Sequence, residues 1–209
     1  MLLRKGLLVV FEGIDGAGKS TQTHMLFEYL KNKGLKVVLS REPTDSIYGQ
    51  RIRDLAQNAR DSISPLEEYR LFVDDRKIHV KNVINPALKS LSIVILDRYY
   101  FSNMAYQGAI GLDPNEIRSE NEAFSPIPDI VFIFNIQPVQ GIERIEKSRK
   151  EKPNLFEKEE NLKRAAKIFD SLKDRFITRV NGAENVDSIH NQVKEKVDEL
   201  IDSHLKKQS

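Results

Sequence analysis

Residues 7–26, LLVVFEGIDGAGKSTQTHML, constrain the fold more than any other stretch of the sequence. An apolar run typical of a buried strand breaks into glycines, and apolar side chains at helical spacing follow after Ser20. Between the two patterns, Gly13, Gly18, Lys19 and Ser20 match the spacing G-x-x-x-x-G-K-[ST]. The sequence therefore predicts a strand, a glycine-rich loop and a helix in immediate succession.

Such a loop is suited to binding a chain of phosphates. Its glycines allow a tight turn that points backbone N–H groups inward. Lys19 would supply a point charge to the β- and γ-phosphates, and the Ser20 hydroxyl is placed to hold a magnesium ion. A chance match in a chain of this length is expected roughly one time in a hundred. We therefore predict binding of a nucleoside triphosphate, with contacts from Gly13, Ile14, Asp15, Gly16, Ala17, Gly18, Lys19, Ser20 and Thr21.

Length and composition exclude several classes of protein. The 209 residues fit one domain, with at most a small lid. No apolar run approaches the roughly 20 residues that span a bilayer, so we expect a soluble, cytoplasmic protein without a membrane partner. The chain has no cysteine, which excludes disulfides and thiolate metal sites. Its net charge is only +2, and the basic stretch 144–152 is interspersed with glutamates, so we predict a solvated helix face and no nucleic-acid partner.

Short strand-like runs alternate with helical patterns along the chain. The runs are Leu7–Phe11, Lys36–Leu39, Ile93–Leu96, Ile130–Phe134 and, near the end, Phe176–Val180. This alternation predicts an α/β fold in which a parallel sheet of about five strands has helices on both faces. A terminal helix is expected at about 186–205, and residues 108–115 and 148–154 are expected to be irregular.

Charged residues follow two of the predicted strands, where an open α/β sheet binds its ligands. Asp97 could hold magnesium through water, and Arg98 could bind a phosphate with two hydrogen bonds. An ion pair between these two residues is the alternative. Arg41 and Glu42, before Pro43, by themselves favour a salt-bridged surface turn.

Phe72 and Arg76 stand four residues apart, on one face of a predicted helix. A ring and a guanidinium at this spacing could stack on a base and hydrogen-bond its edge. The residues alone favour a core phenylalanine beside a solvent-facing arginine. The four histidines have no metal-like pairing and are interpreted as helix-surface or packing residues: His24, His79, His190 and His204.

Several motifs together resemble the thymidylate kinase family of P-loop nucleoside monophosphate kinases. The motifs are FEGIDGAGKSTQ, REP, LFVDDR, DRYYFSNMAYQG and a segment ending in FEKEE, in family order from about residue 7 to 195. The resemblance implies a three-layer P-loop kinase fold over residues 1–209, with a mobile lid at about 144–157. It also implies a homodimer and a magnesium-dependent transfer of the γ-phosphoryl group of ATP to dTMP, giving dTDP and ADP.

The resemblance further implies roles for individual residues around the acceptor. Asp15 would bind the sugar 3′-hydroxyl, and Phe72 would stack on thymine. Arg76 would hydrogen-bond the base edge, and Phe156 would favour deoxyribose. The remaining expected contacts are Ser102, Asn103 and Gln107 in the base pocket, Tyr106 beside them, and Arg53 and Arg98 at the acceptor phosphate.

Catalysis would rest on charge stabilisation, because the acceptor phosphate is already largely dianionic at neutral pH and needs no general base. Ser20, Asp97 and Glu42 are expected to organise magnesium. Lys19, Arg98 and a lid arginine would stabilise the transferred group. Leu155 stands where lids of this family commonly carry arginine, so Arg149 is the candidate, with Arg144, Lys150 and Lys152 as substitutes.

Two other functions compete with this interpretation. A deoxynucleoside kinase phosphorylates a sugar hydroxyl and needs a carboxylate base, for which Glu42 is suitably placed. Phe72, Arg76 and the long SNMAYQG continuation argue against it. A GTP-binding switch is disfavoured because the chain lacks an N-K-x-D motif and a suitable D-x-x-G motif.

Overall fold

A computed structural model of the chain describes residues 3–58, 63–148 and 155–205. The side chains of residues 57–58, 148 and 155–158 lie outside this description. All helices and strands given below belong to the described ranges.

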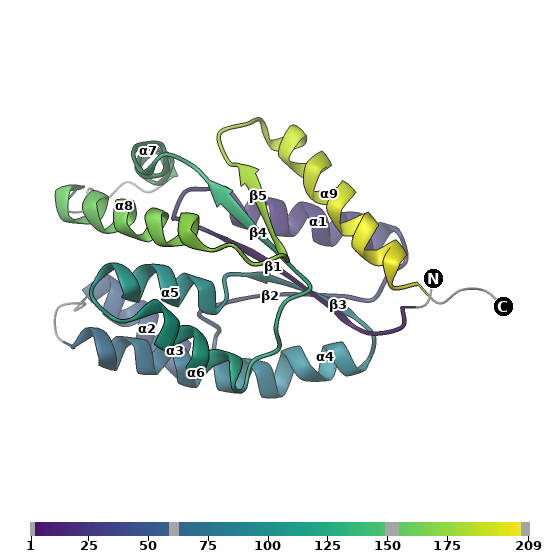
Figure 1. Cartoon of the computed structure of the whole chain (residues 1–209), viewed down its shortest axis with the longest axis horizontal. Coiled ribbons are helices and arrows are strands. Elements are labelled where there is room, and N and C mark those ends of the chain that lie inside the picture. The colour runs from purple at the N-terminus through teal and green to yellow at the C-terminus, as the bar shows by residue number, and fades with distance from the viewer. Residues whose placement is uncertain (1–2, 59–62, 149–154, 206–209) are drawn as a thin grey trace.

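The centre of the fold is a five-stranded parallel sheet in the order β2-β3-β1-β4-β5 (Figure 1). The strands are β1 (Leu7–Gly13), β2 (Val37–Arg41), β3 (Ile93–Asp97), β4 (Ile130–Asn135) and β5 (Ile177–Asn181). The three inner strands are almost wholly buried, which explains their continuous apolar sequences, since helices cover both faces of the sheet. The predicted α/β class, strand number and parallel direction are confirmed.

Helices cover the two faces of this sheet in a three-layer arrangement. Helices α1 (Lys19–Asn32) and α9 (Val186–Ser203) lie together on one side, and α8 (Leu155–Ser171) packs against α5 (Tyr100–Ala109) (Figure 1). The remaining helical elements are α2 (Ile47–Asn58), α3 (Pro65–His79), the π-helical turn η2 (Val80–Ile84), α4 (Asn85–Lys89), α6 (Pro114–Glu122) and α7 (Pro138–Ser148). None of the described helices is long and apolar enough to cross a membrane.

The segment 108–115 is less irregular than its sequence suggests. Helix α5 continues to Ala109, and α6 already begins at Pro114. Asp113 is the N-cap of α6, and its side chain accepts a hydrogen bond from Asn115 N at 2.7 Å. A proline in the first turn preceded by a capping carboxylate is a favourable helix start, so the prediction is correct only for the short turn between the two helices.

Strand register brings the predicted ligand-binding segments to one edge of the sheet. Asp97 at the end of β3 is level with Phe11 of β1 and with Arg41 of β2. The glycine-rich loop after β1, the turn after β2 and the residues after β3 therefore leave the sheet side by side. This edge holds the candidate site.

Candidate functional site

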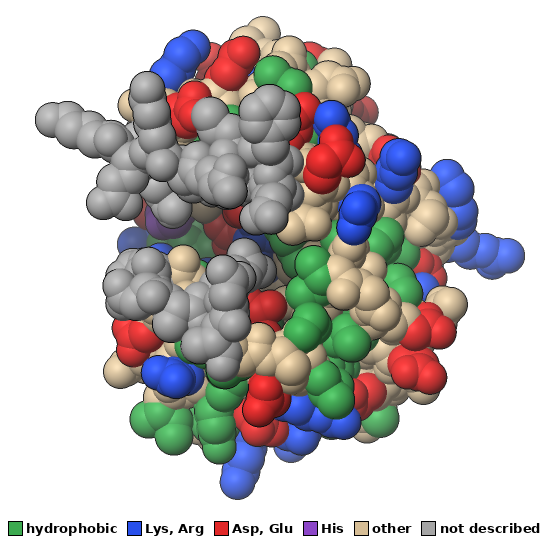
Figure 2. All heavy atoms as spheres, turned by 90° about the vertical axis from the view of Figure 1, so that its left-hand side faces the viewer, with side chains coloured by type: hydrophobic (Ala, Val, Ile, Leu, Met, Phe, Trp, Pro, Cys, Tyr) green, Lys and Arg blue, Asp and Glu red, His purple; other side chains and the backbone are tan. Residues whose placement is uncertain are grey.

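The site is a cleft of about 820 Å³ at the carboxyl edge of the sheet. Figure 2 looks onto this side of the molecule, where charged side chains of both signs lie in a hollow. Its lining includes Asp15, Gly16, Ala17, Gly18, Lys19, Ser20, Arg41, Glu42, Asp97, Arg98, Arg144, Gly182 and Glu184. The phosphate loop and the polar residues after β2 and β3 thus share one cavity.

The phosphate loop needs glycine at two positions for steric reasons. Gly13 has φ 134°, and a Cβ there would lie 2.6 Å from the carbonyl oxygen of Phe134. Gly16 has φ 79°, and a Cβ there would lie 2.3 Å from the carbonyl oxygen of Gly141. These conformations and close approaches exclude other residues, and they bend the loop toward the start of α1.

Lys19 lies at the start of α1 with its ammonium group buried in the loop. Its Nζ donates hydrogen bonds to the carbonyl oxygens of Gly13, at 3.0 Å, and Ile14, at 2.8 Å. Burial, with a smaller contribution from the nearby Arg98 charge, lowers the pKa of Lys19 to about 8. An anion in the loop would restore its preference for the charged form.

Arg98 lies on the other side of the same carbonyl group. Its Nη1 donates to Gly13 O at 3.3 Å and to Ser102 Oγ at 2.8 Å, and its Nη2 forms an ion pair with Asp15 at 2.5 Å. The guanidinium also lies over the ring of Tyr106, 5.2 Å from its centroid. Arg98 thus pairs with Asp15 and not with Asp97, the partner in the alternative interpretation of these residues. Its backbone adopts the left-handed region, with φ 75°, and such strain in a non-glycine residue is typical of functional sites.

Ser20 and Asp97 meet beside the phosphate loop, where the Ser20 hydroxyl donates to an Asp97 carboxylate oxygen. Hydroxyl and carboxylate oxygens are suitable magnesium ligands. Nowhere in the described part of the chain do three or more His, Asp or Glu side chains gather into a metal-binding group. A cation here would therefore take most of its ligands from water and phosphate, as magnesium usually does.

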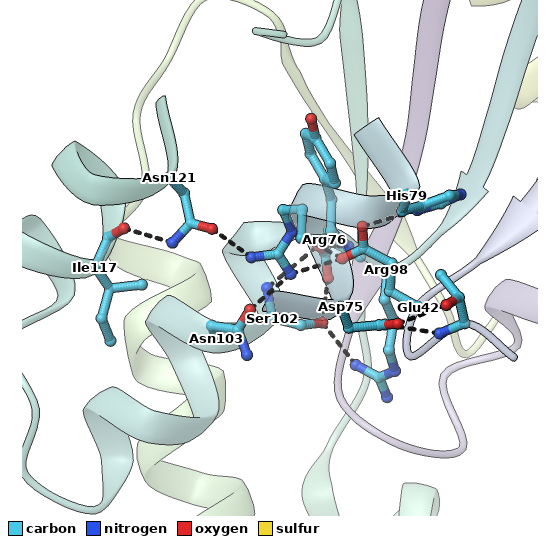
Figure 3. A network of polar contacts seen from close by, with 12 residues as sticks. Glu42, Asp75, Arg76, His79, Arg98, Ser102, Asn103, Ile117 and Asn121 are labelled. Carbon is cyan, nitrogen blue, oxygen red and sulfur yellow. Dashed lines mark hydrogen bonds and ion pairs between the residues drawn. The ribbon is translucent and has the colours of Figure 1, made fainter. Parts of the chain in front are cut away.

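Glu42 belongs to a buried network of side chains (Figure 3). Its Oε2 accepts hydrogen bonds from Arg76 Nε at 2.8 Å and Nη2 at 2.6 Å. Its Oε1 lies 3.0 Å from His79 Nδ1. The expectation of a salt-bridged surface turn is wrong for Glu42, because the residue is only 5% exposed and its charge is paired with buried Arg76.

Arg76 joins this network to helices α5 and α6. Its Nη1 donates to Asn121 Oδ1 at 2.5 Å, and its Nη2 donates to Asn103 Oδ1 at 2.7 Å. Arg76 is only 1% exposed, whereas Phe72 is half-buried, so the preference for a core phenylalanine beside a solvent-facing arginine is wrong.

Other predicted base-pocket residues lie on α5, where Asn103 and Gln107 are buried and bonded to each other at 3.0 Å. Gln107 also donates to Glu68 of α3 at 3.2 Å. Tyr106 accepts a hydrogen bond from the backbone N–H of Asp15 at 3.0 Å, which ties this helix to the phosphate loop. The structure thus brings α3 and α5 into direct contact.

Arg53 lies on α2, close to the loop that follows β2. Its Nη1 donates to Thr44 O at 2.7 Å and its Nη2 to Asp45 at 3.0 Å. Buried Asp75 of α3 anchors the same loop by accepting from Thr44 N at 2.8 Å and from Ser46 Oγ at 2.6 Å. Asp75 therefore sets where the loop beneath Arg53 lies.

The structure describes only part of the predicted lid at about 144–157. Arg144, on α7, donates to Gly182 O at 2.9 Å and to Gly16 O at 3.3 Å, at the edge of the cleft. Arg149, Lys150 and Lys152 lie outside the described residues, as does the side chain of Phe156 at the start of α8. The roles assigned to them stay predictions.

Sequence reasoning missed several residues that build the site, namely Glu12, Glu68, Asp75, His79 as a partner of Glu42, and Asn121. Glu12 stands in β1 directly before Gly13 of the phosphate loop, and an acidic residue in an otherwise apolar strand was the available signal. The partners of Asp75 and Asn121 are distant in sequence, so no local pattern reveals them.

Comparisons with known proteins agree with this geometry. The sequence profile described as Thymidylate kinase matches residues 11–193. Three similar proteins are named thymidylate kinase. The one from Desulfotalea psychrophila is 44% identical over 94% of this chain and 96% of its own length. The one from Akkermansia muciniphila is 46% identical over 85% of this chain and 84% of its own length. The one from Xanthomonas euvesicatoria is 45% identical over 80% of this chain and 72% of its own length.

Proposed function

We infer that this chain, which belongs to the thymidylate kinase family, is a phosphotransferase that moves the γ-phosphoryl group of ATP to dTMP, giving dTDP and ADP. One observation supports this reaction above the others: Lys19 and Arg98 donate to the same carbonyl oxygen, that of Gly13. Two cations beside one point suit a reaction that must bring two anionic phosphates together in line.

On the donor side, we propose that backbone N–H groups of the loop and the amino end of α1 bind the ATP phosphates. Lys19 would exchange its carbonyl partners for phosphate oxygens and neutralise charge as the γ-group transfers. Arg144, Gly182 and Glu184 also line the cleft, and the ATP nucleoside would lie against them.

On the acceptor side, the dTMP phosphate would be bound by Arg98 and Arg53. Because that phosphate is already largely dianionic at neutral pH, the protein has no proton to remove and needs only to hold the group in line. Asp15, paired with Arg98, would bind the sugar 3′-hydroxyl. Tyr106 would support this arrangement from beneath the Arg98 guanidinium.

The thymine base would stack on Phe72, whose half-buried ring is one helical turn before Arg76. Arg76 would donate a hydrogen bond to the edge of the base. Asn103, held by Arg76 and Gln107, would complete the edge of the pocket, while Ser102 and Gln107 support it from behind. Phe156 would limit the space at the sugar 2′-position.

Magnesium fits the Ser20–Asp97 pair, which presents oxygen atoms at the loop. When bound, the ion would neutralise charge on the β- and γ-phosphates. Glu42, the third residue expected to organise magnesium, is already engaged elsewhere, because its Oε2 accepts hydrogen bonds from Arg76 and its Oε1 lies 3.0 Å from His79 Nδ1. Its role would be to hold Arg76.

The remaining expectations are proposals of the same kind. Residues 1–209 would form one kinase domain whose lid, at about 144–157, closes with Arg149 supplying a catalytic charge. The protein would act as a homodimer in the cytoplasm.

The competing nucleoside kinase is not favoured. Its base would be Glu42, but that carboxylate is buried and compensated by Arg76 and His79. Its Oε2 already accepts two hydrogen bonds from Arg76 and its Oε1 lies 3.0 Å from His79 Nδ1, so neither oxygen is directed at a sugar hydroxyl.

The test is ADP release from MgATP with dTMP, dUMP, UMP, dCMP, AMP and thymidine as separate acceptors. We expect dTMP to be the preferred acceptor, with loss of turnover on removal of magnesium. Arg98→Ala should lower turnover with dTMP by on the order of 10²-fold or more. Turnover with thymidine but not with dTMP would contradict the proposal.

A further inference from the structure

Glu12 is a buried carboxylate that neither the phosphate-loop motif nor the mechanism above uses. It is the sixth residue of β1, directly before Gly13, and its side chain is wholly buried. Burial raises its pKa to about 7, against the opposing effect of the nearby Arg98 charge. Burial of a carboxylate lowers the stability of the fold unless the group is hydrogen-bonded, so its hydrogen-bond partners indicate what it does.

The partners of Glu12 all belong to the start of α5. Its Oε1 accepts from the backbone N–H of Tyr99 at 2.7 Å and from that of Ser102 at 3.2 Å. Its Oε2 accepts from the hydroxyl of Ser102 at 2.6 Å. Tyr99, the N-cap residue, makes no side-chain cap of its own, so a carboxylate from the neighbouring strand takes that place.

Ser102 connects Glu12 to Arg98 through its hydroxyl group. Because its hydroxyl hydrogen is directed at Glu12, its oxygen lone pairs are left for Arg98 Nη1, which donates to it at 2.8 Å. The same Nη1 contacts Gly13 O, one residue after Glu12. The chain of contacts from Glu12 through Ser102 therefore fixes the guanidinium at the point where the two phosphates would meet.

We propose that Glu12 is a positioning residue for the acceptor phosphate, which it serves by orienting Arg98 through Ser102. The inference rests on the proposed function, because it takes Arg98 as the group that binds the phosphate of dTMP. Glu12 itself touches no substrate.

A purely structural role predicts a different result. If Glu12 only capped α5, its loss would displace the whole helix, including Asn103 and Gln107 of the base pocket. Binding of the nucleoside part would then weaken as much as binding of the phosphate. Comparison of dTMP with thymidine, which has the same base and sugar but no phosphate, separates the two roles.

The experiment is calorimetric titration of dTMP and of thymidine into the wild type, Glu12→Gln, Ser102→Ala and Arg98→Ala. We expect Glu12→Gln to weaken dTMP binding by on the order of 10-fold, as for a lost charge-assisted contact, and to leave thymidine binding within about twofold. Ser102→Ala removes the hydroxyl between Glu12 and Arg98 but keeps the Glu12 acceptor for the backbone N–H groups, and it should weaken dTMP binding to a similar degree. In the Arg98→Ala background, Glu12→Gln should cause no further loss.

Glu122→Gln is the matched control, since Glu122 accepts from the Tyr100 hydroxyl at 2.9 Å on the same helix but does not contact Arg98. It should leave both affinities unchanged. Equal weakening of dTMP and thymidine binding by Glu12→Gln, or an undiminished effect in the Arg98→Ala background, would overturn the inference. A wild type that neither binds nor phosphorylates dTMP would overturn the proposed function first. Thermal unfolding of each variant confirms that it is folded.

Discussion

The two sides of the cleft are built in opposite ways. The donor side is made mostly of backbone, from consecutive residues 13–20 whose glycines allow close contacts. The acceptor side is made of buried side chains from the turn after β2 and from α3, α5 and α6, joined in the network around Arg76 (Figure 3). The donor side therefore depends on local conformation, and the acceptor side depends on tertiary packing.

This difference teaches where each side is vulnerable. A phosphate loop loses function when one charge or one glycine changes, while the fold persists. A buried network of charges couples function to stability, because removal of one partner leaves another charge uncompensated. Substitutions on the two sides should therefore separate in their effects on turnover and on unfolding.

The largest expected effect is on turnover, from Lys19→Met on the donor side. We expect kcat to fall by on the order of 10³-fold, because a preorganised charge on the transferred group is lost. The melting temperature should not fall, because a buried ammonium with a lowered pKa stabilises the fold little. Coupled ADP-release kinetics and thermal unfolding measure both quantities, with exposed Lys163→Met as the control. A folded variant with near-normal kcat would show that Lys19 does not contact the transferred group.

Glu42→Ala on the acceptor side should have the next largest effect, and this time on stability. Loss of the carboxylate leaves buried Arg76 without its charged partner, which costs about 3 kcal/mol of unfolding free energy. The KM for dTMP should rise and the KM for ATP should change little. Glu120→Ala is the matched control, because Glu120 also contacts α3 but its side chain is 34% exposed. If both variants unfolded at the same temperature, the buried network would not be a main support of this side.

Asp75→Asn should give a smaller change confined to the acceptor side. An amide in place of this carboxylate can accept from Thr44 N but presents a donor to the Thr44 and Ser46 hydroxyls. We expect a loss of about 1–2 kcal/mol in unfolding free energy and a several-fold higher KM for dTMP, since the loop contacting Arg53 loosens. The neighbouring Asp74→Asn, at an exposed ion pair with Lys77, should change neither quantity. A rise in the KM for ATP without a rise in the KM for dTMP would show that the loop after β2 serves the donor and not the acceptor.

The smallest expected effect is a difference in pH dependence between the wild type and Glu12→Gln. Burial raises the folded-state pKa of Glu12 from 4.5 to about 7. Between these pH values the unfolded chain releases the Glu12 proton while the folded chain keeps it, so wild-type stability falls as pH rises toward 7. Relative to Glu12→Gln, the melting temperature of the wild type should fall by at least about 2–4 °C from pH 5 to pH 7. Parallel melting profiles would contradict a raised pKa.

The contrast between the two sides also explains what the sequence could predict. Leu7–Gly13 and the motif around Lys19 are contiguous, so period and spacing suffice to place a strand, a loop and a helix there. The same reasoning found the three inner strands, because buried parallel strands are continuously apolar, and it also located the partly exposed edge strands β2 and β5.

The acceptor side was harder to predict, because burial of a charged residue depends on partners elsewhere in the chain. Arg76 is buried only because Glu42 and Asn121, 34 and 45 residues away, meet it in the fold. The residue types alone predict that Arg76 is exposed and Phe72 lies in the core, and both predictions are wrong. Glu12 was overlooked because its partners, Tyr99 and Ser102, follow β3 in the sequence and reach β1 only through the pairing of these strands.

One measurement tests the central claim that this cleft joins a donor phosphate to an acceptor phosphate. The wild type is incubated with MgATP and an equimolar mixture of dTMP and isotopically labelled thymidine, and the products are separated by chromatography. We predict that unlabelled dTDP accumulates while labelled thymidine remains unchanged. Labelled dTMP formed without dTDP would contradict the account and assign the cleft to a sugar hydroxyl instead.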